Sequence, residues 1–294
     1  MAVIVAGLSP GSKEFAESLA SASGFGLIHA EGKVFPDGEV YVRVEGDVEH
    51  TVIVVQTMSR PQDTSIIQAM LLADALRGLR ARRIILVSPY TAYARQDKRF
   101  LPGEPISIAV ILRSLYTAGY NEYYTIEIHK EEALSAFPGS AVSIYPYYYM
   151  ASKAGIGGDH LILAPDIGAL RRAERLARSL GAQYDYLVKR RDRVTGEITV
   201  EPKHLNVKGR KVVIVDDIIS TGGTVSKAAR LLLDQGAESV EVLVAHAVLA
   251  GNALEKLKGS GVRRVVAGNT LPRVDDPLVE YVDLAPLVSD SLSI

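Results

Sequence analysis

The chain has 294 residues, a formal net charge of −1 and 23% charged residues, enough for one large or two medium domains. Without a basic excess it is not expected to bind nucleic acid. It has no cysteine, which excludes disulfides and thiolate metal sites, and with neither a signal peptide nor a long apolar run we expect a cytoplasmic protein that has no membrane segment.

Short aliphatic, β-branched runs recur along the chain and predict strands. The expected strands are 2–7, 39–44, 51–56, 83–90, 122–128, 161–166, 184–190, 197–201, 211–217, 239–249 and 263–268. Apolar residues three and four positions apart predict helices between many of them, at 63–81, 106–119, 167–182 and 224–237. Because near-continuous aliphatic strands alternate with helices, the expected fold is α/β, with mostly parallel sheets covered on both faces.

The helix limits and one turn carry their own signals. Asp63 is a candidate N-cap, and Gly119, Gly181 and Gly236 are suited to the position after a helix end. The pair Thr195-Gly196 lies between extended runs, which predicts a β-hairpin that projects from the sheet.

The two halves of the chain resemble each other weakly. Segment 81–97 is laid out like 209–225, and 118–130 like 260–273. Two related α/β domains are therefore expected, 1–146 and 147–283, with a C-terminal helix at 284–294 completing the first. The tyrosines at 145 and 147–149, near the expected boundary, favour packing or an interface rather than a nucleotide platform.

The stretch VVIVDDIISTGGTV, residues 212–225, joins an aliphatic strand to a helix start. Its polar residues are Asp216 and Asp217, followed by the loop residues Ser220, Thr221, Gly222, Gly223 and Thr224. Backbone N–H groups at such a helix start suit a phosphate, whereas two carboxylates suit vicinal hydroxyl groups. Ligands of α/β folds bind at this edge of the sheet, so the stretch predicts a sugar-phosphate site rather than a solvated turn.

This stretch resembles the 5-phosphoribosyl-1-pyrophosphate (PRPP) loop that phosphoribosyltransferases share with ribose-phosphate pyrophosphokinases. The resemblance implies that the two acids hold the ribose 2- and 3-hydroxyls and that the loop holds the 5-phosphate. Other segments resemble the pyrophosphokinases in particular: 34–44, 93–100, 165–177 and 188–192. Membership of that family implies two phosphoribosyltransferase-like domains, the substrates ATP and ribose 5-phosphate, the cofactor Mg²⁺, and a homo-oligomer built from dimers.

The expected ATP site combines two segments. In FPDGE, Phe35 can stack on a purine, and Asp37 or Glu39 can accept from an amino group. In YARQDK, the expected residues are Arg95, Gln96 and Asp97. By spacing alone these segments are more typical of a hairpin turn and a basic surface loop, and only the resemblance favours ATP.

The resemblance also assigns metal and catalytic residues. His129 and Asp166 match the family's metal contacts, although Mg²⁺ prefers oxygen ligands, so Asp166 is the better candidate. Lys189 and Arg191, in the expected catalytic hairpin 187–200, would stabilise charge on the transferred group.

Two positions depart from the family pattern: Ile167 stands in place of a histidine, and Leu134 lies in a segment that usually carries glutamines. Two alternatives also remain, a phosphoribosyltransferase that consumes PRPP and a non-catalytic partner of a true synthetase. The first leaves the ATP segments without a role, and the second does not explain why the catalytic positions are retained.

Overall fold

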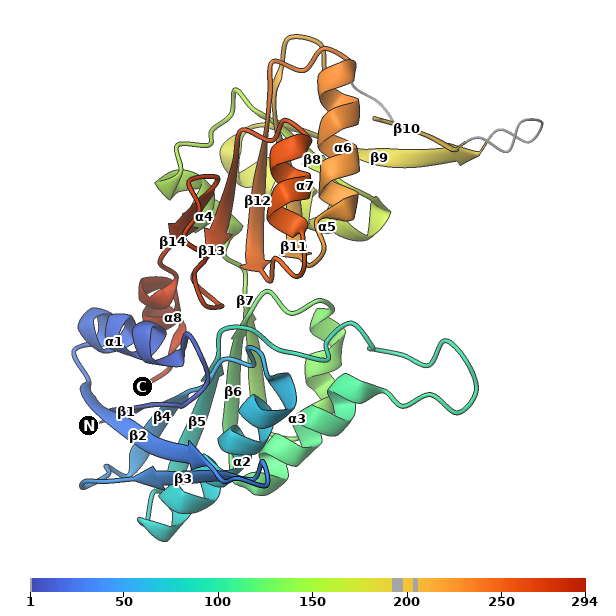
Figure 1. Ribbon diagram of the computed structural model, residues 1–294. Coiled ribbons are helices and arrows are strands. Elements are labelled where there is room, and N and C mark those ends of the chain that lie inside the picture. Colours follow the sequence, from blue (N-terminus) through green and yellow to red (C-terminus); the bar gives the residue numbers. More distant parts are fainter. Residues whose placement is uncertain (1, 192–197, 203–205) are drawn as a thin grey trace. The chain divides into compact units, whose positions relative to one another are not determined.

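The chain forms two compact units in the computed structural model, which describes residues 2–191, 198–202 and 206–294 (Figure 1). Unit 1 comprises Met1–Tyr145, Asn269–Arg273 and Asp283–Ile294, and unit 2 comprises Pro146–Gly268 and Val274–Val282. The expected division at 146 and 283 placed residues 269–273 with the second domain, whereas their contacts group them with unit 1. Within the described part, no helix is both long and apolar enough to span a membrane.

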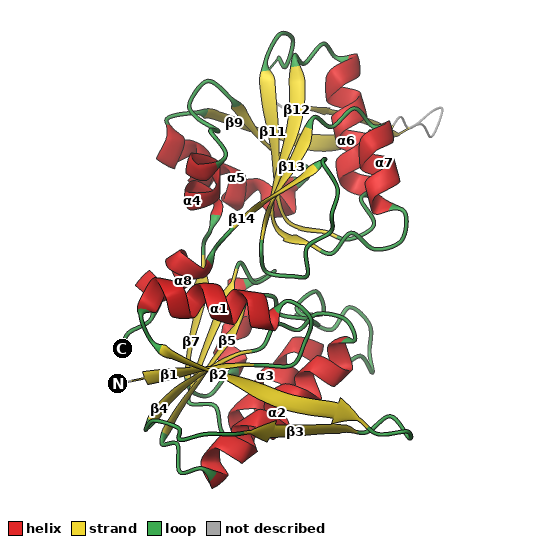
Figure 2. Cartoon of the chain, turned by 60° about the vertical axis from the view of Figure 1, so that its left-hand side comes forward, coloured by secondary structure: helices red, strands yellow, loops and turns green. Residues whose placement is uncertain are grey.

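Unit 1 is built on a seven-stranded sheet in the order β3-β2-β1-β4-β5-β6-β7, parallel except for the β2–β3 pair. Its strands are β1 (Ala2–Ala6), β2 (Gly26–Val34), β3 (Val40–Val44), β4 (Thr51–Val55), β5 (Arg83–Ser88), β6 (Glu122–Ile126) and β7 (Ser140–Ile144). Its helices are α1 (Ser12–Ser23), α2 (Gln62–Gly78), α3 (Ser107–Ala118), the 3₁₀ helix η1 (Glu131–Ala136) and α8 (Ala285–Ser291). In Figure 2, α1 and α8 lie side by side on one face of this sheet, and α2 and α3 cover the other.

Unit 2 repeats this plan, with the sheet order β10-β9-β8-β11-β12-β13-β14 and β10 as its antiparallel edge. Its strands are β8 (Leu161–Ala164), β9 (Gln183–Arg191), β10 (Ile198–Pro202), β11 (Lys211–Ile219), β12 (Ser239–Ala247), β13 (Arg264–Gly268) and β14 (Val279–Val282). Its helices are α4 (Tyr147–Lys153), the 3₁₀ helix η2 (Ile167–Ala169), α5 (Leu170–Leu180), α6 (Gly223–Asp234) and α7 (Ala253–Gly259). Helices α6 and α7 cover one face, and α4 and α5 the other (Figure 1).

The matching strand orders identify the true repeat. Reading both sheets from the antiparallel edge makes β4 equivalent to β11, β5 to β12 and β6 to β13. The expected match of 118–130 with 260–273 therefore pairs equivalent strands. The expected match of 81–97 with 209–225 is wrong, because it pairs β5 with β11, two aliphatic strands that differ by one position in the order.

The structure contains all the expected strands and adds β2, β7 and β14. Aliphatic content could not reveal β2, because it is the second strand from an edge of the sheet and all nine of its residues are half-buried or exposed, without a clear alternation. Strands β7 and β14 are the opposite edges of their sheets and are only five and four residues long.

Two expected helix signals had different outcomes. Gly181 has a left-handed φ of 66° directly after α5, which confirms it as the glycine that ends this helix. The N-cap prediction for Asp63 is wrong: α2 begins at Gln62, and the Asp63 carboxylate instead accepts a hydrogen bond from the Tyr93 hydroxyl. The expected turn at Thr195-Gly196 lies outside the described residues, although the antiparallel pairing of β9 with β10 is described.

Candidate active site

The expected sugar-phosphate site lies at the carboxyl end of β11. The strand runs two residues further than its sequence suggested, to Ile219. Asp216 and Asp217 therefore lie inside the strand, close to its carboxyl end. A three-residue turn, 220–222, then leads directly into α6 at Gly223. A strand that ends this close to a helix start brings the acids and the N-terminus of α6 to the same edge of the sheet.

Hydrogen bonds on one side of the turn orient its peptide groups. The Ala250 N–H donates to the Ser220 carbonyl at 2.8 Å, and Lys256 Nζ donates to the Thr221 carbonyl at 3.3 Å. In a trans peptide the N–H points away from the carbonyl, so the next two N–H groups, of Thr221 and Gly222, face the opposite side. Two N–H groups beside a helix N-terminus form a site for an anion.

Gly222 is required by both conformation and space. Its φ of +71° is left-handed, and a Cβ atom there would lie 3.2 Å from the carbonyl oxygen of Ala253. Gly223, in contrast, has no close neighbour, since the nearest atom to a Cβ would be Thr221 Oγ1 at 4.0 Å. The open space beside Gly223 is where a ligand can approach the backbone.

The two acids, which we call the acid pair (Asp216 and Asp217), lie in an unfavourable electrostatic environment. Burial, and then the charge of Asp217, raise the pKa of Asp216 from 3.8 to about 8. Arg172 of α5 opposes this rise, with Nη1 at 3.4 Å from Asp216 Oδ1 and Nη2 at 3.9 Å from Asp217 Oδ2. Perturbed carboxylates of this kind are common at ligand sites.

Asp166 follows β8, the neighbour of β11, and therefore lies at the same edge of the sheet. Its carboxylate caps η2, where Oδ1 accepts from the Gly168 N–H at 2.8 Å and from the Ala169 N–H at 3.2 Å. Both of these hydrogen bonds fall on one oxygen, and the residue is exposed. Ile167, next in the chain, is 71% exposed and has no polar group for a ligand.

The Phe35–Glu39 segment forms the tight turn between β2 and β3. The Phe35 N–H donates to the Glu39 carbonyl at 2.7 Å, and Asp37 Oδ1 accepts from the Glu39 N–H at 3.2 Å. The Phe35 ring is 38% exposed, packs edge-on against Tyr41, and has Lys33 Nζ at 4.8 Å from its centroid. The segment is thus a hairpin turn that also presents an aromatic face beside a cation.

The Arg95–Asp97 segment follows β5 and is anchored from both sides. Before it, the Tyr93 hydroxyl donates to Asp63 at the start of α2, and Tyr93 has a left-handed φ of 61°. After it, the Ser107 hydroxyl of α3 donates to Gln96 Oε1 at 2.5 Å. Arg95 between these anchors is exposed, and Gln96 and Asp97 are half-buried.

His129 is half-buried and follows β6, the strand next to β5. Glu127, two residues before it, has a left-handed φ of 38°, an uncommon conformation for a residue other than glycine. Leu134 is only 7% exposed and packs in the core of unit 1, which explains an apolar residue at this position. His129 belongs to unit 1 and Asp166 to unit 2, and the described residues contain no cluster of three His, Asp or Glu side chains suited to a metal.

Lys189 and Arg191 lie on β9, where their backbones pair with Val200 and Ile198 of β10. Their side chains are outside the described part of the chain. Their predicted catalytic role therefore remains a prediction.

Within unit 2 the structure brings Asp166, the acid pair and the 220–224 loop to one sheet edge. Within unit 1, Arg95–Asp97 and His129 follow neighbouring strands, whereas β1 and β4 separate the Phe35–Glu39 turn from them in the sheet. Sequence reasoning missed Arg172. Its helix, LRRAERLARSL, has several arginines typical of a solvated face, and only the fold shows which one is buried against the acids.

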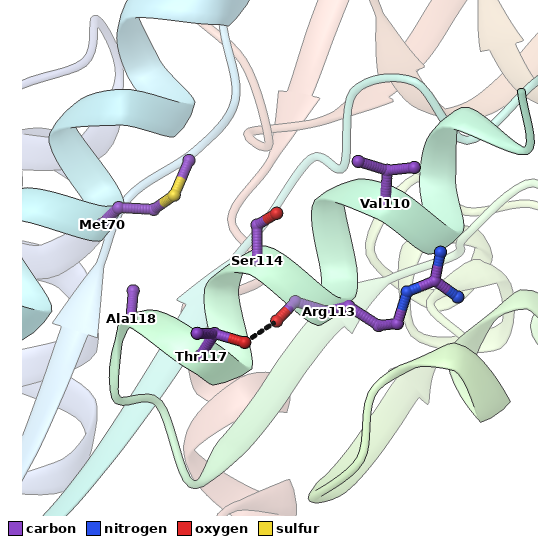
Figure 3. Close-up of a pocket in the computed structure, with 6 residues that line it drawn as sticks. All are labelled: Met70, Val110, Arg113, Ser114, Thr117 and Ala118. Carbon is purple, nitrogen blue, oxygen red and sulfur yellow. Dashed lines mark hydrogen bonds between the residues drawn. The ribbon is translucent and has the colours of Figure 1, made fainter.

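An open pocket of about 440 Å³ lies between α2 and α3 of unit 1 (Figure 3). Its lining residues are Met70, Val110, Arg113, Ser114, Thr117 and Ala118. In Figure 3 the Thr117 hydroxyl donates to the Arg113 carbonyl, and the other lining groups are mostly apolar. None of the expected site residues lines this pocket, and its lining residues form no arrangement suited to catalysis.

Comparison with known proteins places these features in a family. Residues 3–119 match the N-terminal domain of ribose phosphate pyrophosphokinase, and residues 152–269 match the phosphoribosyl transferase domain. A ribose-phosphate pyrophosphokinase of Aeropyrum pernix is 47% identical over 99% of this chain and 96% of its own length. One from Saccharolobus solfataricus is 43% identical over 94% of this chain and 96% of its own length.

A solved structure supports the same relationship. The phosphoribosylpyrophosphate synthetase of Mycobacterium smegmatis, at 28% identity, superimposes with a TM-score of 0.88 over 99% of this chain and 97% of that one. The strand orders, the sugar-phosphate loop and these matches agree over nearly the whole length. The chain therefore belongs to the ribose-phosphate pyrophosphokinase family.

Proposed function

We propose that this protein is a ribose-phosphate diphosphokinase, which transfers the β,γ-diphosphoryl group of ATP to the 1-hydroxyl of ribose 5-phosphate. The products are PRPP and AMP. The observation that carries the proposal is that one chain combines the loop of unit 2 with the two candidate ATP segments of unit 1, in a family relationship that spans 99% of its length. A phosphoribosyltransferase needs only the first of these parts.

In the proposed reaction, O1 of ribose 5-phosphate attacks the β-phosphorus of ATP. The bond from that phosphorus to the oxygen shared with the α-phosphate breaks, AMP leaves with the bonding electrons, and the O1 proton passes to solvent. Such a transfer depends on positioning and on charge stabilisation more than on covalent participation by the protein.

Each group of residues has a place in this scheme. The acid pair accepts hydrogen bonds from the ribose 2- and 3-hydroxyls, and the 5-phosphate lies on the N–H groups and hydroxyls of residues 220–224. Phe35 stacks on the adenine, and Asp37 and Glu39 accept from its amino group. Arg95, Gln96 and Asp97 contribute to the triphosphate side, and Lys189 and Arg191 stabilise the charge that develops on the transferred group.

The family implies a divalent metal, and Asp166 fits Mg²⁺ better than His129 does. Asp166 offers an exposed carboxylate, and Mg²⁺ is commonly bound by one or two carboxylates together with water and substrate phosphates, so three protein ligands are not required. When bound, the ion would neutralise phosphate charge on the transferred group. A cytoplasmic location and a homo-oligomer built from dimers remain predictions.

The test is AMP formation by the purified protein with ATP, ribose 5-phosphate and MgCl₂, measured by chromatography. AMP should appear only when both substrates are present. Absence of AMP under these conditions would contradict the proposal. Release of pyrophosphate from PRPP on addition of a nucleobase would support the transferase alternative instead.

A further inference from the structure

We infer that Arg172 is a positioning residue of the ribose site, because its guanidinium lies against both carboxylates of the acid pair. The inference rests on the proposed function, in which that pair binds the ribose hydroxyls. It concerns how the pair is kept in a binding arrangement, and it assigns part of this task to α5, outside β11 and its loop.

The contacts are those of one planar fork facing two acceptors. Nη1 lies 3.4 Å from Asp216 Oδ1, and Nη2 lies 3.9 Å from Asp217 Oδ2. The three side chains are largely removed from solvent, with exposed fractions of 11% for Arg172, 21% for Asp216 and 7% for Asp217. A charge pair so shielded is stronger than one on the surface.

The backbone makes one contact that orients the pair, since the Asp217 N–H donates to Asp216 Oδ1 at 2.9 Å. Consecutive residues of a strand point to opposite faces of the sheet, and Asp216 and Asp217 are consecutive residues of β11. In this structure the two carboxyl groups nevertheless lie on the same side, where they are hydrogen-bonded to each other, and a single guanidinium contacts both. Arginine suits this task, because its two terminal nitrogens diverge in a fixed plane.

Tyr147 of α4 supports the arginine from a second direction. The Arg172 Cζ atom is 5.9 Å from the centroid of the Tyr147 ring, within range of a cation–π contact. The Tyr147 hydroxyl donates to the backbone carbonyl of Asp216 at 2.8 Å, and the residue is fully buried. One tyrosine thus contacts both the guanidinium and the strand that bears the acids.

The charged and titratable groups that face Asp216 are Asp217, Arg172 and the Tyr147 hydroxyl at the backbone. The guanidinium favours an ionised Asp216 carboxylate, and so, to a smaller extent, does the Asp217 N–H, which donates to Asp216 Oδ1 at 2.9 Å. Without the guanidinium, Asp216 would stay protonated up to a higher pH, and the acid pair would lose a contact that orients both carboxyl groups. Both effects weaken binding of the ribose hydroxyls and leave binding of ATP unaffected.

The test compares Arg172→Gln and Arg172→Lys with Arg178→Gln. Arg178 lies on the same helix, its side chain is 74% exposed, and it pairs with Glu174. For Arg172→Gln, we expect KM for ribose 5-phosphate to rise about 10-fold or more, with KM for ATP changed less than about twofold. Arg172→Lys should recover part of the loss, and Arg178→Gln should behave like the parent.

The pH profile separates positioning from a merely structural role. In Arg172→Gln, the acidic limb of kcat/KM for ribose 5-phosphate should move up by about one pH unit. Tyr147→Phe retains the ring and loses the hydroxyl, so KM for ribose 5-phosphate should rise by a smaller factor with the limb in place. If Arg172→Gln does not fold, a KM for ribose 5-phosphate that is unchanged in both Arg172→Lys and Tyr147→Phe overturns the inference.

An equal rise in both KM values of Arg172→Gln, or an acidic limb that does not move, also overturns it. Calorimetric titration with ribose 5-phosphate distinguishes failure of this inference from failure of the proposed function. A parent protein that binds ribose 5-phosphate but forms no AMP refutes the function alone. The inference then still stands if Arg172→Gln binds ribose 5-phosphate about 10-fold more weakly.

Discussion

The environment of Asp216 suits ligand binding but lowers the stability of the folded protein when its carboxyl group is charged. Its carboxyl group is largely buried beside Asp217, and both conditions disfavour the charged form. Because folding raises the pKa of Asp216 above 3.8, its contribution to stability is complete below that pH and is lost as the pH rises through about 8. The free protein is thus destabilised in the pH range where the acid pair accepts hydroxyl groups.

Replacement of the Asp216 carboxyl group by a neutral amide should remove this destabilisation at high pH. Asp216→Asn should be more stable than the parent at pH 9, by about 1–3 kcal/mol, and the difference should shrink towards pH 4. Urea unfolding at a series of pH values measures it. Asp290→Asn, at an exposed position on α8, is the matched control and should show no such trend. A difference for Asp216→Asn that is independent of pH would contradict the account.

For individual residues, the sequence predicts a functional role when the residues that share it are neighbours in the chain. The acid pair and its loop are contiguous, so their chemistry could be predicted from one stretch of sequence. Arg172 and Tyr147 lie 44 and 69 residues before Asp216, and their contacts with it depend on how α5 and α4 pack on the sheet. No local pattern carries that information.

The β11–α6 turn depends on one backbone conformation. Gly222→Ala would place a Cβ on a residue with φ of +71°, 3.2 Å from the Ala253 carbonyl oxygen. We expect a loss of about 1–2 kcal/mol in unfolding free energy and a rise of about 10-fold or more in KM for ribose 5-phosphate. Steady-state kinetics and urea unfolding measure the two effects.

Gly181→Ala separates conformational strain from damage to the site. Gly181 has a similar φ of +66°, but a Cβ there meets nothing within 4 Å. This variant should lose stability and keep its KM for ribose 5-phosphate. Equal kinetic losses in both glycine variants would mean that the turn has no special role.

The segment before α3 should position the triphosphate side of ATP. Tyr93→Phe removes the hydrogen bond to Asp63 and leaves a left-handed residue without its anchor, so KM for ATP should rise about threefold to 10-fold. KM for ribose 5-phosphate should stay constant. Tyr116→Phe, at an exposed tyrosine of α3, is the control. An unchanged KM for ATP in Tyr93→Phe would show that the anchor is dispensable.

The elements that could be predicted are those whose burial is evident from a run of aliphatic residues in the sequence. Strands such as β4 and β11 are buried along most of their length and therefore read as aliphatic runs. Strand β2 pairs near an edge, where exposed residues such as Lys33 and Glu31 conceal it. Asp63 is not the N-cap because α2 begins one residue before it, at Gln62, and its carboxylate accepts a hydrogen bond from Tyr93 instead.

The whole molecule is a duplicated fold in which the two copies differ at equivalent sites. The turn after β4, Gln56–Pro61, is equivalent to the β11–α6 turn, but it contains no glycine and ends in proline, which lacks an N–H. Gln56 is fully buried, and its Oε1 accepts from the N–H groups of Leu8 and Ser9 at 2.8 and 3.3 Å. The first side chain of this turn thus satisfies two N–H groups of the neighbouring β1–α1 loop, at the same edge of the sheet.

This difference predicts a stoichiometry. Titration calorimetry should find one ribose 5-phosphate site per chain, and Gly222→Ala should weaken it. A second site of similar affinity that persists in Gly222→Ala would show that unit 1 also binds the sugar phosphate.

The most direct test of the central claim is ³¹P NMR of the protein with ATP, ribose 5-phosphate and MgCl₂. If the bond between the α- and β-phosphates breaks, AMP and PRPP should form in equal amounts, with a new pair of coupled diphosphate signals on the sugar. Formation of ADP and a ribose bisphosphate, or AMP with free pyrophosphate and unchanged ribose 5-phosphate, would contradict the account.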